Sequence, residues 1–326
     1  MKKNFCFIII NFFLSNSYAQ DYSAYYQHID SAKYFKRIHN YKLSDSLYAL
    51  SFRDFRGFPD DYLNAVNVHY KFTHQLNKTY ITQGFENGLL LRELYDELRT
   101  DSISYSKREL KKLHRKHRVR KSINVYPIAR MLLRDAWARM RSKNVEKADS
   151  INALKMAKLL STKPELFNRH KTGYIWSSML NIIILHSQWK RTESLFNSWK
   201  DMVKKGYLDR EPLYTLIDRN SLQYGYLFHI DSASNKIIGE ENGNLPICPH
   251  YIFHSNLGQF YYYRRTINKN LLVPLNPTIS TMQLNKLRHY LFLPSIELFL
   301  KTNPTLTICT EEEFCSSLPF ALTQSK

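Results

Sequence analysis

Apolar residues recur at the three- and four-residue spacing of amphipathic helices over most of the chain. In the first third, this pattern predicts helices over 22–38, 43–55, 60–73, 86–98 and 106–118. The turns His39-Asn40-Tyr41 and Gly57-Phe58-Pro59 separate the first three, and Asp60 or Asp61 is expected to cap the third.

The pattern continues after residue 125. It predicts helices over 127–141, 144–160, 173–186, 189–206, 210–219 and 282–300, the last of them broken at Pro294. The helix over 173–186 is apolar nearly all round and is therefore expected to be central and buried. The segment Gln223-Tyr224-Gly225-Tyr226 is expected to leave the helical conformation, and two apolar runs around Asn268-Lys269-Asn270 indicate a hairpin. The prediction is a mostly α fold of helical hairpins or a bundle, with a small β-hairpin near 260–273.

Composition agrees with a folded helical protein. The 326 residues are 44% apolar and 14% aromatic, with 9 glycines and 11 prolines. This excludes collagen-like and disordered chains, and the scarcity of turn residues disfavours an all-β sandwich.

The N-terminus has the layout of a secretory signal peptide. Lys2 and Lys3 precede an apolar run over 5–14, and Ser17-Tyr18-Ala19 supplies the small residues of a cleavage site. The run is much shorter than a membrane span, for which about 20 residues are needed. We therefore expect 1–19 to be removed and the protein to be exported to the bacterial periplasm or the extracellular space, without a transmembrane span.

Charge is unevenly distributed. The chain carries 47 Lys and Arg against 28 Asp and Glu, a formal charge of +19, and nine of the cations lie between residues 107 and 121 with Glu109 as the only acid. Such a run can bind nucleic acid by counterion release. Export of the protein, the absence of an aromatic residue from the run and the absence of a nucleic-acid fold signature disfavour nucleic acid as the partner. A solvated helix face is one interpretation, and an anionic envelope surface is the partner that suits the compartment. The residues proposed for that contact are Lys111, Lys112, Arg115 and Lys116. The run also marks the expected boundary between a helical, repeat-like region over 20–121 and a second helical domain over 122–326.

Two resemblances follow from short motifs. The first two helices resemble a tetratricopeptide hairpin, with Ala32, Tyr41, Tyr48 and Phe52 at small and aromatic packing positions.

Residues 125–300 resemble a bacterial family of unknown function, domain-of-unknown-function family 6624. The residues that carry the second resemblance are Asp135-x-x-x-Arg139, Asp149-x-x-Asn152, Gly173, His186, Asp218-Arg219 and Gln223-Tyr224-Gly225. Ala136, Leu185 and Tyr226-Leu227 depart from the family's pattern, and a segment of about 231–270 is inserted. The resemblance implies no reaction.

The candidate polar site is drawn from the same region: His186, Asp218, Arg219, Gln223 and Tyr224. If they converge, they offer a base, a carboxylate, and amide and phenol donors around a cleft, as an envelope hydrolase would need. The alternative is structural: His186 caps helix carbonyls, Asp218 pairs with an arginine, and the last two residues fix a turn. A non-catalytic binding or interaction protein of the cell envelope is the favoured function.

No cofactor or metal site is predicted. His250 and His254 have helix-compatible spacing, but their neighbours favour loop or strand. Cys309 and Cys315 are the natural disulfide pair in an oxidising compartment, and the sequence leaves open whether they form one.

Overall fold

The computed structural model describes residues 21–118, 124–224, 226–231, 233–241, 261–265, 270–274, 280–302 and 306–308. Helices dominate these residues, so the predicted mostly α class is confirmed. The signal peptide, His250 and His254, and Cys309 and Cys315 lie outside the described residues. No helix of the described part is long and apolar enough to cross a membrane.

Six helices form the N-terminal part. They are α2 (Ser23–Arg37), α3 (Tyr41–Asp54), α4 (Pro59–Thr73), α5 (Lys78–Glu86), α6 (Leu91–Thr100) and α7 (Lys107–His117). The predicted turn between the first two is present: His39 has a φ of 61°, and the Asn40 side chain caps α3 by accepting from the Leu43 N–H.

Two predictions in this part were wrong. Neither Asp60 nor Asp61 caps α4, because the helix already begins at Pro59, whose fixed φ suits a first helical position. The helix expected over 86–98 is α6, which begins five residues later, at Leu91, and α5 before it was not predicted. Gly88, with a φ of 101°, sits in the left-handed region between them and turns the chain.

The C-terminal part continues with more helices. They are α8 (Tyr126–Met140), α9 (Val145–Thr162), the 3₁₀ turn η1 (Pro164–Phe167), α10 (Arg169–Thr172), α11 (Tyr174–Leu185), α12 (Trp189–Lys204), α13 (Glu211–Tyr224), α14 (Thr281–Tyr290) and α15 (Ile296–Thr302). The predicted inner face of α12, Trp189, Phe196, Trp199 and Val203, is buried as expected. The break near Pro294 separates α14 from α15.

Strands make two small sheets beside the helices. β1 (Tyr226–Ile230) and β2 (Ile237–Glu241) pair antiparallel, and β3 (Tyr261–Arg265), β4 (Asn270–Pro274) and β5 (Leu306–Ile308) form a three-stranded sheet. The antiparallel β3–β4 pair is the hairpin predicted near 260–273, whereas β1–β2 was not predicted.

Two further expectations need correction. Gln223 and Tyr224 are the last residues of α13, so the helix extends five residues past its predicted end at Arg219. The helix α11 is only partly buried: Leu180, Ile183 and Ile184 are in the core, but Ile175 and Ile182 are exposed. The helix α11 is therefore not fully buried, although it is apolar nearly all round.

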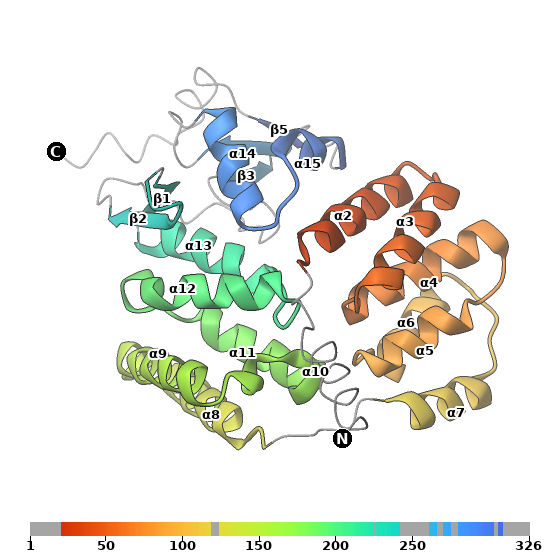
Figure 1. The fold of residues 1–326 in the computed structure, drawn as a ribbon, viewed down its shortest axis with the longest axis horizontal. Coiled ribbons are helices and arrows are strands. Elements are labelled where there is room, and N and C mark those ends of the chain that lie inside the picture. The colour runs from red at the N-terminus through yellow and green to blue at the C-terminus, as the bar shows by residue number, and fades with distance from the viewer. Residues whose placement is uncertain are drawn as a thin grey trace, which may run out of the picture.

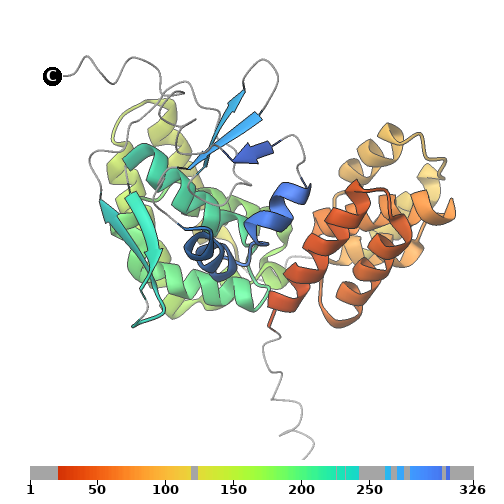
Figure 2. The same cartoon turned by 90° about the horizontal axis from the view of Figure 1, so that it is seen from above.

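The two parts of the chain lie beside each other, with α2 close to α15 (Figures 1 and 2). Their buried apolar side chains belong to one continuous cluster. Two arginines cross the junction. The buried Arg169 donates to the carbonyls of Arg56 and Gly57, between α3 and α4, and Arg210 pairs with Asp30 of α2. The N-terminal helices are thus held by polar as well as apolar contacts.

Candidate functional sites: a basic helix face and a buried ionic network

The helix α7 has one inward face and one outward face. Ser106 caps it by accepting from the Glu109 N–H at 3.3 Å. Leu110 is buried, and the His114 ring meets Phe85 of α5 edge-on, with the ring centroids 5.0 Å apart. His117 lies 2.8 Å from a carboxylate oxygen of Glu86. These contacts fix the rotation of α7 on α5.

The outward face is cationic except for Glu109. All four cations proposed from the sequence, Lys111, Lys112, Arg115 and Lys116, are exposed. The single acid of the helix, Glu109, is already paired with Lys78 of α5 at 2.6 Å. Within the described chain, no ion pair is recorded for these four cations.

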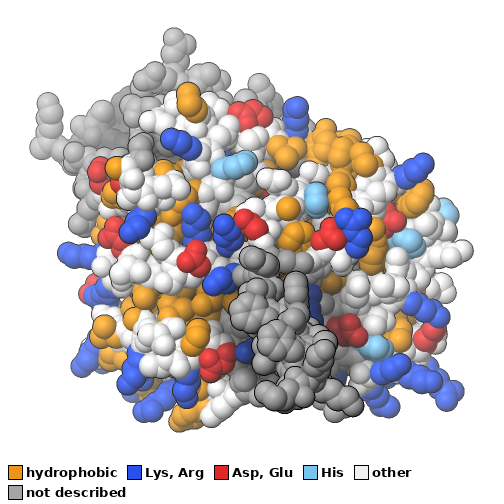
Figure 3. Space-filling view, viewed as in Figure 1, with side chains coloured by type: hydrophobic (Ala, Val, Ile, Leu, Met, Phe, Trp, Pro, Cys, Tyr) orange, Lys and Arg blue, Asp and Glu red, His pale blue; other side chains and the backbone are white. Residues whose placement is uncertain are grey.

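These side chains also surround a hollow. An open depression of about 610 Å³ is lined by Lys107, Arg108, Lys111, Lys112 and Arg115. Figure 3 shows Lys and Arg side chains gathered along the edge of the molecule where α7 and α8 run, at the bottom of the view. Five like charges around one depression repel one another, and an anion bound among them relieves that repulsion.

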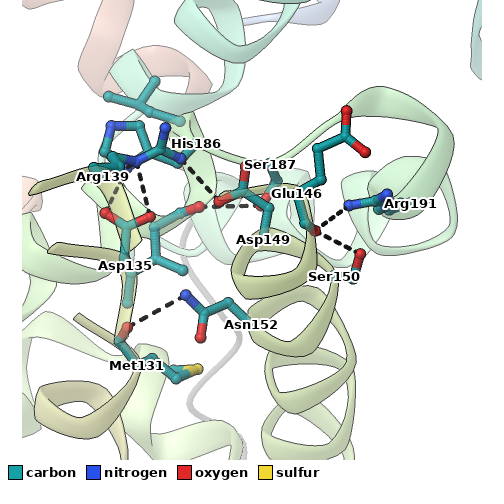
Figure 4. A network of polar contacts seen from close by, with 12 residues as sticks. Met131, Asp135, Arg139, Glu146, Asp149, Ser150, Asn152, His186, Ser187 and Arg191 are labelled. Carbon is teal, nitrogen blue, oxygen red and sulfur yellow. Dashed lines mark hydrogen bonds and ion pairs between the residues drawn. The ribbon is translucent and has the colours of Figure 1, made fainter. Parts of the chain in front are cut away.

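His186 lies in a separate ionic network (Figure 4). It follows the last residue of α11, and its Nδ1 is 2.7 Å from Oδ2 of Asp135 on α8. Arg139, one turn later on α8, donates from Nε to Oδ1 of Asp135 at 3.1 Å and from Nη2 to Asp149 of α9 at 2.8 Å. One imidazole, one guanidinium and two carboxylates therefore join three helices.

The electrostatics of the network follow from burial and pairing. Burial alone would raise the pKa of Asp135, but the hydrogen bond and charge of His186, together with Arg139, outweigh it and lower that pKa. For Asp149, burial dominates and raises the pKa despite the opposing charge of Arg139. The pKa of Asp135 is thus lowered, and its Oδ2 lies beside Nδ1 of His186, a nitrogen that is also 3.0 Å from the Nε donor of Arg139.

The predicted partners of His186 on α13 have other contacts. Arg219 donates from Nη1 to the carbonyl of Leu185, the last residue of α11, and Asp218 is 4% exposed. The neighbouring Asn220 accepts from the Trp189 N–H at 2.7 Å and donates to the Ser187 carbonyl at 3.3 Å. Arg219 and Asn220 of α13 therefore stabilise the turn between α11 and α12, which contains His186. The side chains of Gln223 and Tyr224 lie outside the described set.

Asp135, Arg139 and Asp149 were not among the predicted site residues. All three belong to the motifs that carry the family resemblance, and the structure brings them together with His186. The i, i+4 spacing of Asp135 and Arg139 was the available signal. Nothing in the sequence says that this pair faces inward.

The described residues contain no cluster of His, Cys, Asp and Glu suited to a metal ion. No protein-family model matches the chain, and searches of curated proteins and of solved structures found no match.

Proposed function

We propose that this is an exported, non-catalytic binding protein of the cell envelope, which attaches to an anionic surface through the outward face of α7. The observation that carries the proposal is the hollow lined by five cations, none of which has a recorded acidic partner in the described chain. An array of this kind attracts polyanions from a distance and releases counterions when it binds them.

The geometry favours a specific attachment over diffuse charge. The neutralised Glu109 and the inward-facing Leu110 leave one sign of charge on the outer side of α7. Because the helix is fixed to α5, its cations are presented together instead of moving independently.

Retention on immobilised dextran sulfate, a soluble polyanion, tests the proposal. Replacing Lys111, Lys112, Arg115 and Lys116 with Gln should lower the salt concentration needed for elution. The matched control replaces four other exposed lysines with Gln: Lys163, Lys190, Lys205 and Lys236. Both variants lose four charges, so equal loss of retention would show that net charge, and not α7, is responsible.

Export is part of the proposal and has its own test. The charged start, the apolar run and the small residues at 17–19 support cleavage after Ala19. Mass spectrometry of the mature protein should find Gln20 as its first residue, and an intact Met1 would contradict export by this route.

One observation favours a second candidate function, hydrolase-like chemistry. The His186 imidazole is paired with the Asp135 carboxylate at 2.7 Å, as catalytic imidazoles often are, and its side chain is 27% exposed. However, the recorded partners of His186 among the described residues are Asp135 and Arg139, which are engaged in ion pairs, and neither is a hydroxyl or thiol that an imidazole could activate. The carboxylates and the guanidinium of the network satisfy one another, so we favour a structural role for it.

A further inference from the structure

The helix α8 is turned with its ionic residues inward and an apolar stripe outward. Ile128, Met131, Asp135 and Ala138 form the buried face. The opposite face carries Tyr126, Leu133, Trp137 and Met140, which are 64%, 70%, 56% and 80% exposed. Leu133, Trp137 and Met140 follow one another at helical spacing, and Tyr126 lies two turns before Leu133 on the same face, so the four form one stripe.

The network around His186 explains this rotation. Asp135 and Arg139 bind His186 and Asp149, and their side chains can do so only if the remaining face of α8 is directed outward. Large exposed apolar side chains grouped on one face mark a contact surface, whereas single ones need no explanation.

The surroundings of the stripe indicate what it contacts. Arg130, Arg141 and Lys143 flank it and are exposed, and Asp135, the only acid between residues 126 and 143, faces inward. The Arg141 guanidinium lies 3.8 Å from the centre of the Trp137 ring. A protein partner would not need a rim of a single charge sign, but a helix lying in an anionic lipid interface combines these features: aromatic and aliphatic residues inserted, and Arg and Lys at the headgroups.

The basic face of α7 lies at the same edge of the molecule. Both helices run along the lower edge in Figure 1, and Figure 3 shows cations at both ends of that edge with apolar side chains near α8. The two helices supply complementary contributions: long-range attraction to anionic headgroups from α7, and apolar insertion from α8.

We infer that α8 inserts its Tyr126–Leu133–Trp137–Met140 stripe into the headgroup region of an anionic lipid membrane, and that α7 secures the protein there. This inference rests on the proposed function and narrows its anionic surface to a lipid bilayer.

The protein contains its own probe for insertion. Of its four tryptophans, Trp189 and Trp199 are fully buried and Trp176 is half-buried, whereas Trp137 is exposed. The full chain is mixed with vesicles of phosphatidylcholine and phosphatidylglycerol, or of phosphatidylcholine alone. With the anionic vesicles, Trp emission should move to shorter wavelength, and Trp137→Phe should abolish the shift.

Co-sedimentation with the same vesicles measures affinity. The double variant Leu133→Ser, Met140→Ser should bind anionic vesicles about tenfold more weakly or worse, because two inserted side chains lose their apolar atoms. The matched control, Ile38→Ser with Met282→Ser, changes two exposed apolar residues away from α8 and should bind as the wild type does.

The outcomes separate the inference from the proposed function. Vesicle binding that needs the α7 cations, but neither responds to the double variant nor shifts Trp137 emission, would overturn insertion and leave the anionic attachment standing. Retention on dextran sulfate without vesicle binding would overturn the lipid assignment in favour of an anionic polymer. A dimer that the double variant converts to a monomer would assign the stripe to self-association and would also overturn the inference.

Discussion

Replacing Arg169 should have the largest effect of any single substitution at the junction between the two parts of the chain. Arg169 is 3% exposed and donates to three carbonyls: Gly206 at 2.9 Å, Gly57 at 2.9 Å and Arg56 at 2.6 Å. Its guanidinium also lies 3.6 Å from the centre of the Phe58 ring. One side chain thus connects the α3–α4 turn to the turn after α12.

The expected cost can be worked from these contacts. A hydrogen bond to a charged group contributes about 1.5–3 kcal/mol, so three would contribute roughly 5–9 kcal/mol before desolvation is counted. Burying the guanidinium costs several kcal/mol, which offsets part of that contribution. Without the guanidinium, each buried carbonyl left without a donor costs about 1–3 kcal/mol. We therefore expect Arg169→Met to lower the free energy of unfolding by about 4 kcal/mol, and Arg169→Lys by about 2 kcal/mol, because an ammonium cannot reach all three carbonyls.

Equilibrium urea denaturation followed by two probes is the assay. All four tryptophans lie between residues 137 and 199, so their fluorescence reports on the C-terminal part, whereas circular dichroism reports on every helix. If Arg169 couples the parts, the two transitions coincide in the wild type and separate in Arg169→Met. The control is Arg92→Met, since the Arg92 side chain is 91% exposed. Coincident transitions in Arg169→Met, with stability within about 1 kcal/mol of the wild type, would refute this reasoning.

Three further substitutions test other parts of the structure by thermal or urea denaturation. Gly206→Ala should cost about 2 kcal/mol or more, because Gly206 has a φ of 67° and a Cβ there would meet the Tyr22 ring; an unchanged stability would contradict this. Asp135→Asn should cost about 3 kcal/mol at neutral pH. Because the folded-state pKa of Asp135 is lowered, the wild type loses this advantage as pH falls below about 4, and a gap independent of pH would contradict the ionic assignment. Desolvation by the surrounding protein, followed by the charge of Asp61, raises the pKa of Asp60 to about 6, so the stability that protonated Asp60 contributes is lost as pH rises from about 4 to that value. Asp60→Asn should therefore gain stability relative to the wild type between about pH 4 and pH 6, by less than about 1 kcal/mol because the residue remains accessible to solvent, and a relative loss would be the contrary result.

Local pattern predicted most of the helices. Where a start signal and an apolar face agree, as at Ser106 before α7 or Pro127 within the first turn of α8, the predicted and observed helices differ by one or two residues. The predicted helix ends are wrong where one glycine or one tertiary contact determines where the helix begins or ends. The turn at Gly88 keeps residues 87–90 out of the helix predicted over 86–98, and residues 220–224 stay helical where Arg219 and Asn220 contact the turn between α11 and α12.

The site could be predicted only in part. The charge of α7 is local information, and its exposure follows because a helix with one buried leucine and many cations must turn them to solvent. The network depends on which face of α8 is inside. The hydrophobic pattern favours burying the face of α8 that carries Leu133, Trp137 and Met140. The structure buries the opposite face, because Asp135 and Arg139 find their partners His186 and Asp149 there.

The central claim, attachment to an anionic surface through α7, is tested most directly by the salt dependence of binding to dextran sulfate. The logarithm of the affinity should fall linearly with the logarithm of the salt concentration, with a slope set by the number of cations engaged. Replacing Lys111, Lys112, Arg115 and Lys116 with Gln should make that slope shallower by roughly three to four, whereas the Lys163, Lys190, Lys205 and Lys236 control should leave it unchanged. An identical slope in the wild type and the α7 variant would contradict the claim.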